Sequence, residues 1–531
     1  MVLLTALIMS ACKKQWDQRD KVTNQKFDVN LMQQIKANPN LSTFARFLAK
    51  GGYDKILSSS KNFTVWAPTN DSFQGVDTNF VAAGGGLDTA KLHRFLGNHI
   101  VNQTYLTTNI EASARIRTLN GKFITITSST AEDAHITAAD DYVGNGVLNV
   151  IDKVLVPKMN IDEYITSLSG SDLTLQKQYI RSQDSTYTDT ASATVQSIDP
   201  VTGNPILVPG TGIVKLNKYY NKVGNLASED STYTYFILND AAYTAETNKV
   251  KPFFTTVSGS ADTTAQLAAY NVLKDVMVKG KISQANLAAT LTSVMGKPVP
   301  VNSGAVVSSY EASNGMVYVV NSMNFDLHNK IDTITIQGEQ PSFYMRTDQA
   351  GTSEHTLFRT YLDNNGVKYH DLYISGQNIS GTGIAKYFAG YKISNLNTCK
   401  YQVVIRAYND TLVTHIPATT SKVPNPFGDG VIQENVAFGP TVGVTVNAGS
   451  VVPIYNVTFD PFNVEPFVYE EREIVNAKST GTITTINASS DGKLNVIGLR
   501  SVNMYVIGAN LKDTNLNNIL VDYIKLIPII N

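Results

Sequence analysis

The residues best suited to chemistry lie in one acidic stretch near the C-terminus, FDPFNVEPFVYEEREI. Its candidate carboxylates are Asp460, Glu470, Glu471 and Glu473. Two carboxylates about 5–10 Å apart in one cleft can cleave a glycosidic bond, one as acid and the other as base or nucleophile. No spacing in the stretch singles out a pair, and EERE is more simply explained as a solvated strand or loop. A glycan-acting hydrolase with its site in the C-terminal β region is therefore the alternative hypothesis.

Other catalytic or metal-binding patterns are weak. The seven histidines are scattered, with no pair at metal-ligand spacing beside a third ligand in sequence. Asp140-Asp141 could bind calcium, but the sequence favours a solvated turn. The chain has no Gly-x-Ser-x-Gly nucleophile elbow, and GKPVP lacks the upstream glycine spacing of a phosphate loop. We expect no catalytic residue, no metal and no cofactor.

The N-terminus carries a different kind of chemistry at Cys12. Val2 to Ala11 is apolar apart from Thr5 and Ser10, about half the length that a membrane-spanning helix needs. Small residues stand just before the cysteine, as at a signal cleavage site. The pattern resembles a bacterial lipoprotein box, which implies removal of residues 1–11 and a lipid anchor on Cys12. No Lys or Arg precedes the apolar run, so we expect the natural start to lie upstream.

Residues 12–26 are expected to form a lipidated tether. CKKQWD resembles the segment after the lipidated cysteine in surface-exposed lipoproteins of Gram-negative bacteria that import glycans and peptides. This resemblance implies a lipid-anchored, surface-exposed protein of the outer membrane. The only other cysteine is Cys399, so a disulfide framework is excluded.

Composition narrows the remaining possibilities. A net charge of −1 gives no reason to expect a nucleic-acid partner, and no later segment is apolar enough to span a bilayer. Apolar residues make up 43% of the chain, which is ordinary for globular domains. Charged residues make up only 16%, and Thr, Ser, Asn, Val and Tyr are plentiful, which suits extracellular β-rich domains.

An internal repeat recurs after about 170 residues. NFTVWAPTNDSF from Asn62 aligns with TYTYFILNDAAY from Thr232, each predicting a strand followed by a turn. TLNGKFITI aligns with SVMGKPVPV, and NGVLNVIDKVLVP with NGMVYVVNSMNFD. The Asn-Gly dipeptides at 145–146 and 314–315 predict tight hairpins, because both residue types tolerate positive φ. The segment LMQQIKANPNLSTFARFLAKGGYDKIL is expected to be helical, with Leu41, Phe44, Phe47 and Leu48 on one face and Gly51-Gly52 ending a helix.

These blocks resemble the fasciclin domain. TVWAPTNDSF resembles its first motif, GNHIV its short central motif, and NGVLNVIDKVLVP its second motif. The resemblance covers residues 27–158 strongly. It covers 159–331 weakly, with Val276 in place of His99 and an insertion at about 183–230. It implies a seven-stranded β-sandwich or wedge with helices, and adhesion or ligand binding instead of catalysis. Candidate motif contacts are Thr69, Asn70, Asp71 and His99, although a buried hydrogen bond for His99 and a turn or cap at 70–71 are the structural alternatives.

From about residue 332 to 531, alternating runs separated by Gly, Asn, Asp and Pro predict an all-β sandwich. NTCKYQVVIRAYN and VDYIKLIPI resemble strands of a jelly-roll, galactose-binding-type module. This implies a glycan-binding role, for which the weak candidates are Tyr361, Tyr369, Tyr391 and Tyr455. Each tyrosine also suits a core position. The fold class expected is thus α+β multidomain: two fasciclin-like domains followed by a jelly-roll-like sandwich.

The leading hypothesis is a non-enzymatic surface lipoprotein for adhesion or ligand binding. Its expected partners are the lipid on Cys12, an outer-membrane transporter or other surface protein, and a glycan. A more specific version makes it an accessory subunit of a glycan- or peptide-uptake complex. A passive spacer is a third possibility, which would show no concave or aromatic patch on its outermost domain.

Overall fold

The computed structural model describes residues 28–346, 356–362, 368–375, 387–409, 431–440, 456–465, 469–481, 484–509 and 518–530. Cys12, the tether and Tyr455 lie outside the described residues. The chain divides into two compact units, unit 1 (Met1–Ile237, Met277–Leu287 and Val306–Val320) and unit 2 (Leu238–Val276, Ala288–Ala305 and Asn321–Asn531). Within the described ranges, none of the helices has the length and apolar character needed to cross a bilayer.

Unit 1 begins with a seven-stranded sheet in the order β2-β1-β7-β6-β5-β4-β3. β1 and β7 run parallel, and the other neighbours are antiparallel. The strands are β1 (Phe63–Pro68), β2 (Ile100–Val101), β3 (Ala114–Arg117), β4 (Phe123–Ile126), β5 (Thr130–Ala131), β6 (Ala134–Val143) and β7 (Gly146–Ile151). The strand predicted in NFTVWAP and the hairpins predicted at TLNGKF and at residues 145–146 are confirmed.

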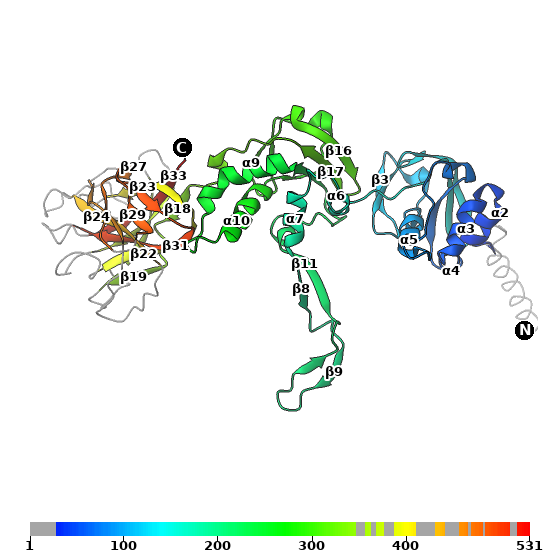
Figure 1. The fold of residues 1–531 in the computed structure, drawn as a ribbon, viewed down its shortest axis with the longest axis horizontal. Helices are drawn as coiled ribbons and strands as arrows, with labels where there is room; N and C mark the ends of the chain where they lie inside the picture. Colours follow the sequence, from blue (N-terminus) through cyan, green and yellow to red (C-terminus); the bar gives the residue numbers. More distant parts are fainter. Residues whose placement is uncertain are drawn as a thin grey trace, which may run out of the picture. The chain divides into compact units, whose positions relative to one another are not determined.

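Short helices pack on this sheet (Figure 1). They are α2 (Leu31–Ala37), η2 (Pro39–Leu41), α3 (Ser42–Lys50), α4 (Tyr53–Leu57), η3 (Asn70–Phe73), α5 (Thr89–Gly97) and η4 (Thr107–Asn109). The predicted apolar face, Leu41, Phe44, Phe47 and Leu48, is buried. The helical segment is broken before Pro39, because proline lacks an N–H and holds the preceding residue extended.

The second copy repeats part of this sheet in unit 1, with the strand order β13-β12-β17-β16 in place of β2-β1-β7-β6. These strands are β12 (Tyr233–Leu238), β13 (Met277–Lys279), β16 (Val306–Ala312) and β17 (Gly315–Val320). The accompanying helices are α6 (Ile161–Ser167), α7 (Leu175–Ser182), α8 (Lys218–Lys222) and η6 (Gln284–Asn286). The remaining elements of the second copy belong to unit 2.

The same three hydrogen bonds of an asparagine side chain, called the asparagine clamp below, fix both hairpins. Asn145 accepts a hydrogen bond from the Leu31 N–H (2.8 Å) and donates to the carbonyls of Leu57 and Ser59. Asn314 makes the corresponding bonds to Ile161, Leu226 and Ser228. Of each Asn-Gly pair only the glycine takes positive φ. The asparagine is required because its amide makes these three hydrogen bonds. The glycine is required because a Cβ at its position would overlap a backbone carbonyl of the neighbouring strand.

The insertion forms a two-stranded β arm. β8 (Asp184–Thr188) pairs with β11 (Ile213–Asn217), and β9 (Val195–Ile198) pairs with β10 (Pro205–Leu207). Figure 1 shows this ribbon running out from α7 and ending beyond β9.

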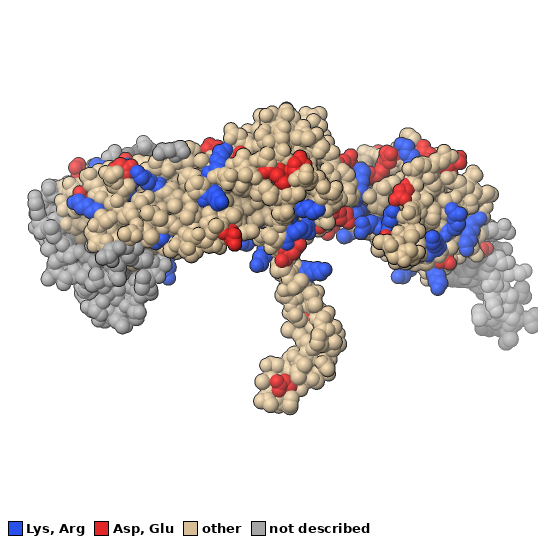
Figure 2. Space-filling model, viewed as in Figure 1, with Lys and Arg blue, Asp and Glu red and all other residues tan. Residues whose placement is uncertain are grey.

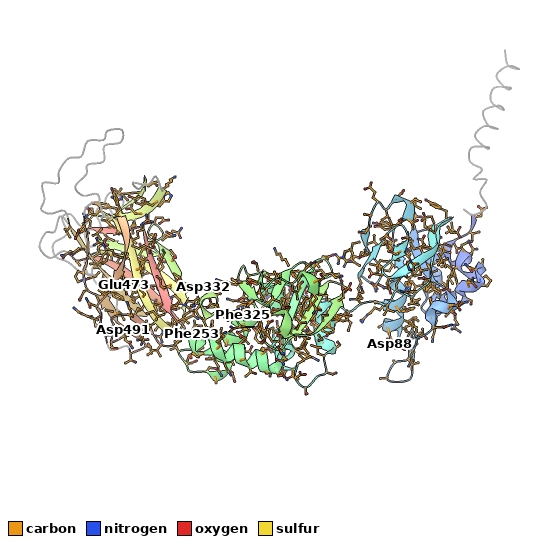
Figure 3. All side chains as sticks on the ribbon, turned by 90° about the horizontal axis from the view of Figure 1, so that it is seen from above. Asp88, Phe253, Phe325, Asp332, Glu473 and Asp491 are labelled. Atoms are coloured by element: carbon orange, nitrogen blue, oxygen red, sulfur yellow. The ribbon has the colours of Figure 1, made fainter. Side chains whose placement is uncertain are left out.

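Unit 2 contains helices α9 (Asp240–Val250), η5 (Lys251–Phe254) and α10 (Ala261–Leu273), the hairpin β14 (Thr290–Thr292) and β15 (Pro298–Pro300), η7 (Ser303–Ala305) and η8 (Leu327–Asn329). Where the first copy has η3, the second has α9, capped by Asn239, whose side chain accepts from the Ala242 N–H. The carbonyl of Phe253, labelled in Figure 3, accepts hydrogen bonds from Asn397 and Thr398, which ties η5 to the β region that follows.

The described residues of the C-terminal part of unit 2, from 332 onward, form strands and no helix, as predicted. One sheet has the order β18-β33-β23-β30-β29 with β27 on β23, another the order β19-β22-β31-β24-β25-β28 with β26 on β24, and a third the order β20-β21-β32. Buried residues from these sheets, including Tyr391, Tyr401, Phe438, Met504 and Leu526, form one core. The strands are β18 (Ile334–Gln337), β19 (Phe343–Arg346), β20 (Thr356–Leu362), β21 (Lys368–Ile374), β22 (Tyr387–Leu396), β23 (Cys399–Tyr408), β24 (Ile432–Pro440), β25 (Val457–Phe459), β26 (Phe462–Val464), β27 (Tyr469–Ile474), β28 (Ala477–Ser479), β29 (Ile486–Ala488), β30 (Leu494–Val496), β31 (Arg500–Gly508), β32 (Ile519–Val521) and β33 (Tyr523–Ile529).

Candidate binding site

The residues of the first motif mainly hold the fold together. Asn70 accepts a hydrogen bond from the Thr43 N–H (2.9 Å), which caps α3, and donates to the Pro39 carbonyl (3.0 Å). The Thr69 N–H donates to the Ile151 carbonyl. Asp71 is exposed on η3. Asp71 therefore offers the most exposed side chain of the three to a ligand that approaches this turn, since Thr69 and Asn70 are half-buried.

His99 is fully buried and bonded through both ring nitrogens. Nδ1 lies 3.0 Å from the Phe95 carbonyl, and the Leu155 N–H donates to Nε2 over 3.0 Å. Because Nε2 accepts, the proton of the neutral ring sits on Nδ1. Burial lowers the pKa of His99 to about 4, so the ring is uncharged at neutral pH. This is the buried structural hydrogen bond that the sequence left open as an alternative to ligand contact.

Two of the four glycan-contact tyrosines need correction. Tyr391 is 1% exposed and donates its hydroxyl to the Gly338 carbonyl, and Tyr369 is 5% exposed. Neither ring is open to stack on a sugar, because inward positions of the strands carry the core. Tyr361 lies in β20, but its side chain is outside the described residues, as is Tyr455.

The carboxylates of the alternative hypothesis are engaged separately by lysines. Glu471 pairs with Lys525, Glu473 with Lys493, and Asp460 with Lys478. Figure 3 labels Glu473 among the strands of unit 2. Hydrogen bonds from Lys525 and Tyr523 lower the pKa of Glu471, whereas a general acid needs a raised pKa. The side chain of Glu470 lies outside the described residues, and no observation favours a hydrolase.

Asp140 and Asp141 also serve the fold. The Asp140 carboxylate accepts hydrogen bonds from the backbone and hydroxyl of Thr107, and Asp141 accepts one from Gln34. The solvated turn expected here was wrong, because both residues lie in β6, beside a register shift, and their carboxylates bond within the protein. Across the described parts of the chain, no group of three or more His, Cys, Asp or Glu side chains could hold a metal ion.

A cavity of about 480 Å³ lies within unit 1, a size that suits a small ligand or part of a larger one. It is formed by β4, the turn between β5 and β6, residues 154–158 and β16. Its walls mix rings and charges: Asn98, Lys122, Phe123, Ile124, Glu132, Asp133, Val154, Leu155, Val156, Pro157, Lys158, Tyr310 and Ser313. A hollow of about 200 Å³ shares Phe123 and Lys158 with it, and one of about 400 Å³ shares Val156 and Pro157.

One wall of the cavity is a buried ionic network centred on Lys122. The Lys122 Nζ lies 2.8 Å from Glu163, 2.9 Å from Glu229 and 3.2 Å from the Ser313 hydroxyl. Burial would raise the pKa of Glu163, but hydrogen bonds from Lys122 and the Asn160 N–H outweigh it and lower the pKa. The network joins the β3–β4 hairpin of the first copy to α6 and the residues before β12.

A second ionic cluster lies at the wall that the cavity shares with the hollow of about 200 Å³. Lys158 contacts Glu132 (3.1 Å) and Glu311 (2.9 Å), and Lys281 contacts Glu311 (2.7 Å). Hydrogen bonds from Lys281 and Lys158 lower the pKa of Glu311 to about 2, so the carboxylate stays ionised. Nearby, the rings of Tyr310 and Tyr164 stack at 4.3 Å.

The lysines of the cavity wall, Lys122 and Lys158, both pair with carboxylates, and its lining combines these ion pairs with the rings of Phe123 and Tyr310. Sequence reasoning missed Lys122, Phe123, Lys158 and Tyr310. These residues line one cavity only because the first and second copies pack against each other. The one available signal was the alignment of Lys122 with Lys297 in the repeat.

Comparison with known proteins identifies residues 39–157 as a fasciclin domain. The transforming growth factor-beta-induced protein ig-h3 of Oryctolagus cuniculus is 28% identical over 137 residues, 24% of this chain and 19% of that protein. Protein sll1483 of Synechocystis is 26% identical over 136 residues, 25% of this chain and 75% of that protein. A solved FAS1 domain pair from the insect cell adhesion molecule fasciclin I is 15% identical with a TM-score of 0.22, covering 56% of this chain and all of that one.

Proposed function

We propose that this protein is a non-enzymatic, lipid-anchored surface protein that binds another macromolecule and so mediates adhesion. The observation that carries the proposal is the fasciclin domain at residues 39–157, a domain that occurs in cell adhesion proteins. The match spans only 19% of the length of ig-h3, so the role of the whole chain is inferred from this domain and from the cavity beside it.

The anchor is the second part of the proposal. Cys12 carries the lipid, residues 12–26 form the tether, and the protein stands on the outer membrane of a Gram-negative cell. Several acyl chains on one cysteine hold firmly, because each buried CH2 contributes about 0.8 kcal/mol. The apolar run before Cys12 and the polar run after it support this location.

A more specific role is accessory subunit of an outer-membrane complex that takes up glycans or peptides. Two features support that role. One is the CKKQWD segment, and the other is the all-β region, which resembles a jelly-roll glycan-binding module. The fasciclin domains would then connect the anchor to the binding module.

The experiment is purification of the tagged full chain from gently solubilised membranes, followed by identification of what co-purifies. Recovery with an outer-membrane transporter supports the uptake role. Recovery without a transporter, together with adhesion of cells to a coated surface, supports a freestanding adhesin. Adhesion that is unchanged when the gene is deleted, with no partner recovered, would rule out both.

A variant at the cavity tests whether binding occurs there. Val156 is 60% exposed at the rim, so Val156→Glu adds charge to the site without disturbing the core. Val307, 63% exposed on β16 and absent from the cavity wall, provides the matched control Val307→Glu. Loss of partner recovery with the first variant and retention with the second place the ligand at this cavity; equal recovery excludes it.

A further inference from the structure

An ion pair inside unit 2 is shielded from water. The charged side chains visible in Figure 2 lie at the surface, scattered among uncharged residues. The side chains of Lys330 and Asp275 are instead 1% and 0% exposed, and the Lys330 Nζ lies 2.6 Å from Asp275 Oδ2. Taking two charges out of water costs about as much free energy as their attraction returns, so stability alone does not account for this pair.

The first copy has no ion pair at this position. By the alignment of the two copies, the residue in the place of Asp275 is the neutral Asn98. Its amide donates a hydrogen bond to the Leu155 carbonyl and accepts one from Asn120. Neutral hydrogen bonds are therefore enough for the fold at this point. The second copy instead holds a carboxyl group and an amine in contact, and these two groups can react with each other.

The surroundings of Lys330 lower the pKa of its amine. The Phe325 ring, labelled in Figure 3, covers Nζ at 3.7 Å and shields it from water. Burial lowers the pKa of Lys330 to about 8. The positive charge of Lys274 acts in the same direction, whereas Asp275 and Glu246 oppose it. A share of the amine is therefore uncharged near neutral pH, and a lysine desolvated in this way is an activated nucleophile.

The Asp275 carboxyl group is held at both oxygens. Oδ2 contacts the Lys330 Nζ, and Oδ1 accepts a hydrogen bond from the Ser293 hydroxyl over 3.0 Å. The Cγ atom is bonded to Oδ2 and so lies at most about 3.8 Å from Nζ. Groups fixed this close react as if each were present at very high concentration. The Ser293 hydroxyl also stabilises negative charge that builds on Oδ1 when a nucleophile adds to Cγ.

We propose that Lys330 and Asp275 join in an amide bond within the folded chain. A proton passes from the ammonium group to Oδ2 along their hydrogen bond, which leaves a neutral amine beside a carboxylic acid. Nζ then adds to Cγ, a second proton moves from Nζ to Oδ2, and the bond between Cγ and Oδ2 breaks. One N–C bond forms and one water leaves, so the step needs no oxidant, reductant or added reagent. The buried site excludes bulk water, which opposes hydrolysis of the product.

The bond links the end of α10 to the start of the all-β region. Asp275 lies two residues after α10, and Lys330 lies four residues before β18. A pull on the β region then reaches α10 through the amide and bypasses the strands between residues 276 and 329. This protects a protein that carries force in adhesion, as proposed above, but formation of the bond depends only on the chain itself.

Peptide mapping of the purified full chain in detergent tests the bond. Trypsin cuts after Lys274 and Lys279 and so releases Asp275 in the peptide 275–279. Trypsin does not cut after a lysine whose amine is acylated, so a cross-linked Lys330 stays within the peptide 282–346. The two peptides then appear as one branched species, about 18 Da lighter than their combined mass because one water is lost.

The matched control is Lys330→Arg, which keeps the positive charge but cannot form the amide, because a guanidinium group stays protonated. The proposal predicts the branched species from wild type and only linear peptides from the variant. Linear peptides alone from folded wild type would overturn it. So would a loss of about 18 Da confined to the peptide 275–279, which an imide of Asp275 would give.

The wild-type chain decides the question by itself, so a variant that fails to fold does not leave the proposal untested. Linear peptides from a protein that does reach the cell surface refute only the amide bond. A branched species from a protein that proves to be periplasmic refutes only the surface role.

Discussion

Acidification should destabilise the first fasciclin domain through His99. The ring is fully buried, and its neutral form is fixed by the Leu155 N–H, which donates to Nε2. Protonation would replace that acceptor with a second N–H directed at a backbone donor, inside the core. The domain therefore has to unfold, or expose the ring, before His99 can take up a proton.

The size of the effect follows from the two pKa values. An unfolded histidine titrates near 6.5, whereas burial lowers the pKa of His99 in the folded domain to about 4. Between these values the unfolded chain binds more protons, so the free energy of unfolding falls as pH falls. The contribution is complete above about pH 6.5 and is lost as the pH drops toward 4. The loss between about pH 7.5 and 4.5 comes to about 2.5 kcal/mol.

Urea denaturation followed by tryptophan fluorescence measures this directly. The chain has two tryptophans, and Trp66 lies buried in β1 with its backbone N–H bonded to the His99 carbonyl, so a Trp16→Phe background reports on this sheet. His99→Val, the residue found at the aligned position 276, should be less stable at neutral pH, by about 1–3 kcal/mol for each unpaired backbone group. It should also lose the pH dependence described above. His135→Gln, at an exposed position, should keep it. The same pH dependence in wild type and His99→Val would refute the reasoning.

Three further predictions concern the clamps and the ionic groups. Asn145→Ala and Asn314→Ala should each destabilise unit 1 by about 3 kcal/mol in urea denaturation, because each leaves one buried N–H and two carbonyls unpaired. A loss of stability in one variant alone would show that the two clamps are not equivalent. Lys122→Met should cost about 3–5 kcal/mol by leaving Glu229 buried and unpaired, and Lys122→Met with Glu229→Gln should recover part of this; no recovery would contradict the pairing. The ionised Glu311 should contribute about 1 kcal/mol to the free energy of unfolding, after allowance for its exposure. This contribution is present above about pH 4.5 and is lost as the pH falls toward 2, and Glu311→Gln should abolish that part of the acid titration.

The fold was predictable where local patterns and the repeat reinforced each other. The alternation in NFTVWAP gave the strand, glycines marked the hairpins, and Phe44 and Leu48 fell on the buried face of α3. The Asn-Gly turns were located correctly, but the role of the asparagine side chain was not predicted. Asn145 serves a helix start more than 100 residues away in sequence, which no local turn rule contains.

The site was much less predictable. Lys122 looked like part of a hairpin, and its partners Glu163 and Glu229 come from segments that only the packed chain brings to it. Tyr391 could have been a platform or a core residue, because alternation along a strand does not say which face is inward. The insertion was located by comparing the two copies of the repeat, but its paired strands depend on register, which neither the comparison nor the composition specifies.

Protease treatment of intact cells that make the tagged full chain tests most directly whether the protein is anchored at the cell surface. We expect added protease to remove the wild-type protein from intact cells. We also expect that Cys12→Ala no longer fractionates with the outer membrane. A chain that stays intact in whole cells and is cut only after lysis would contradict a surface-anchored binding protein.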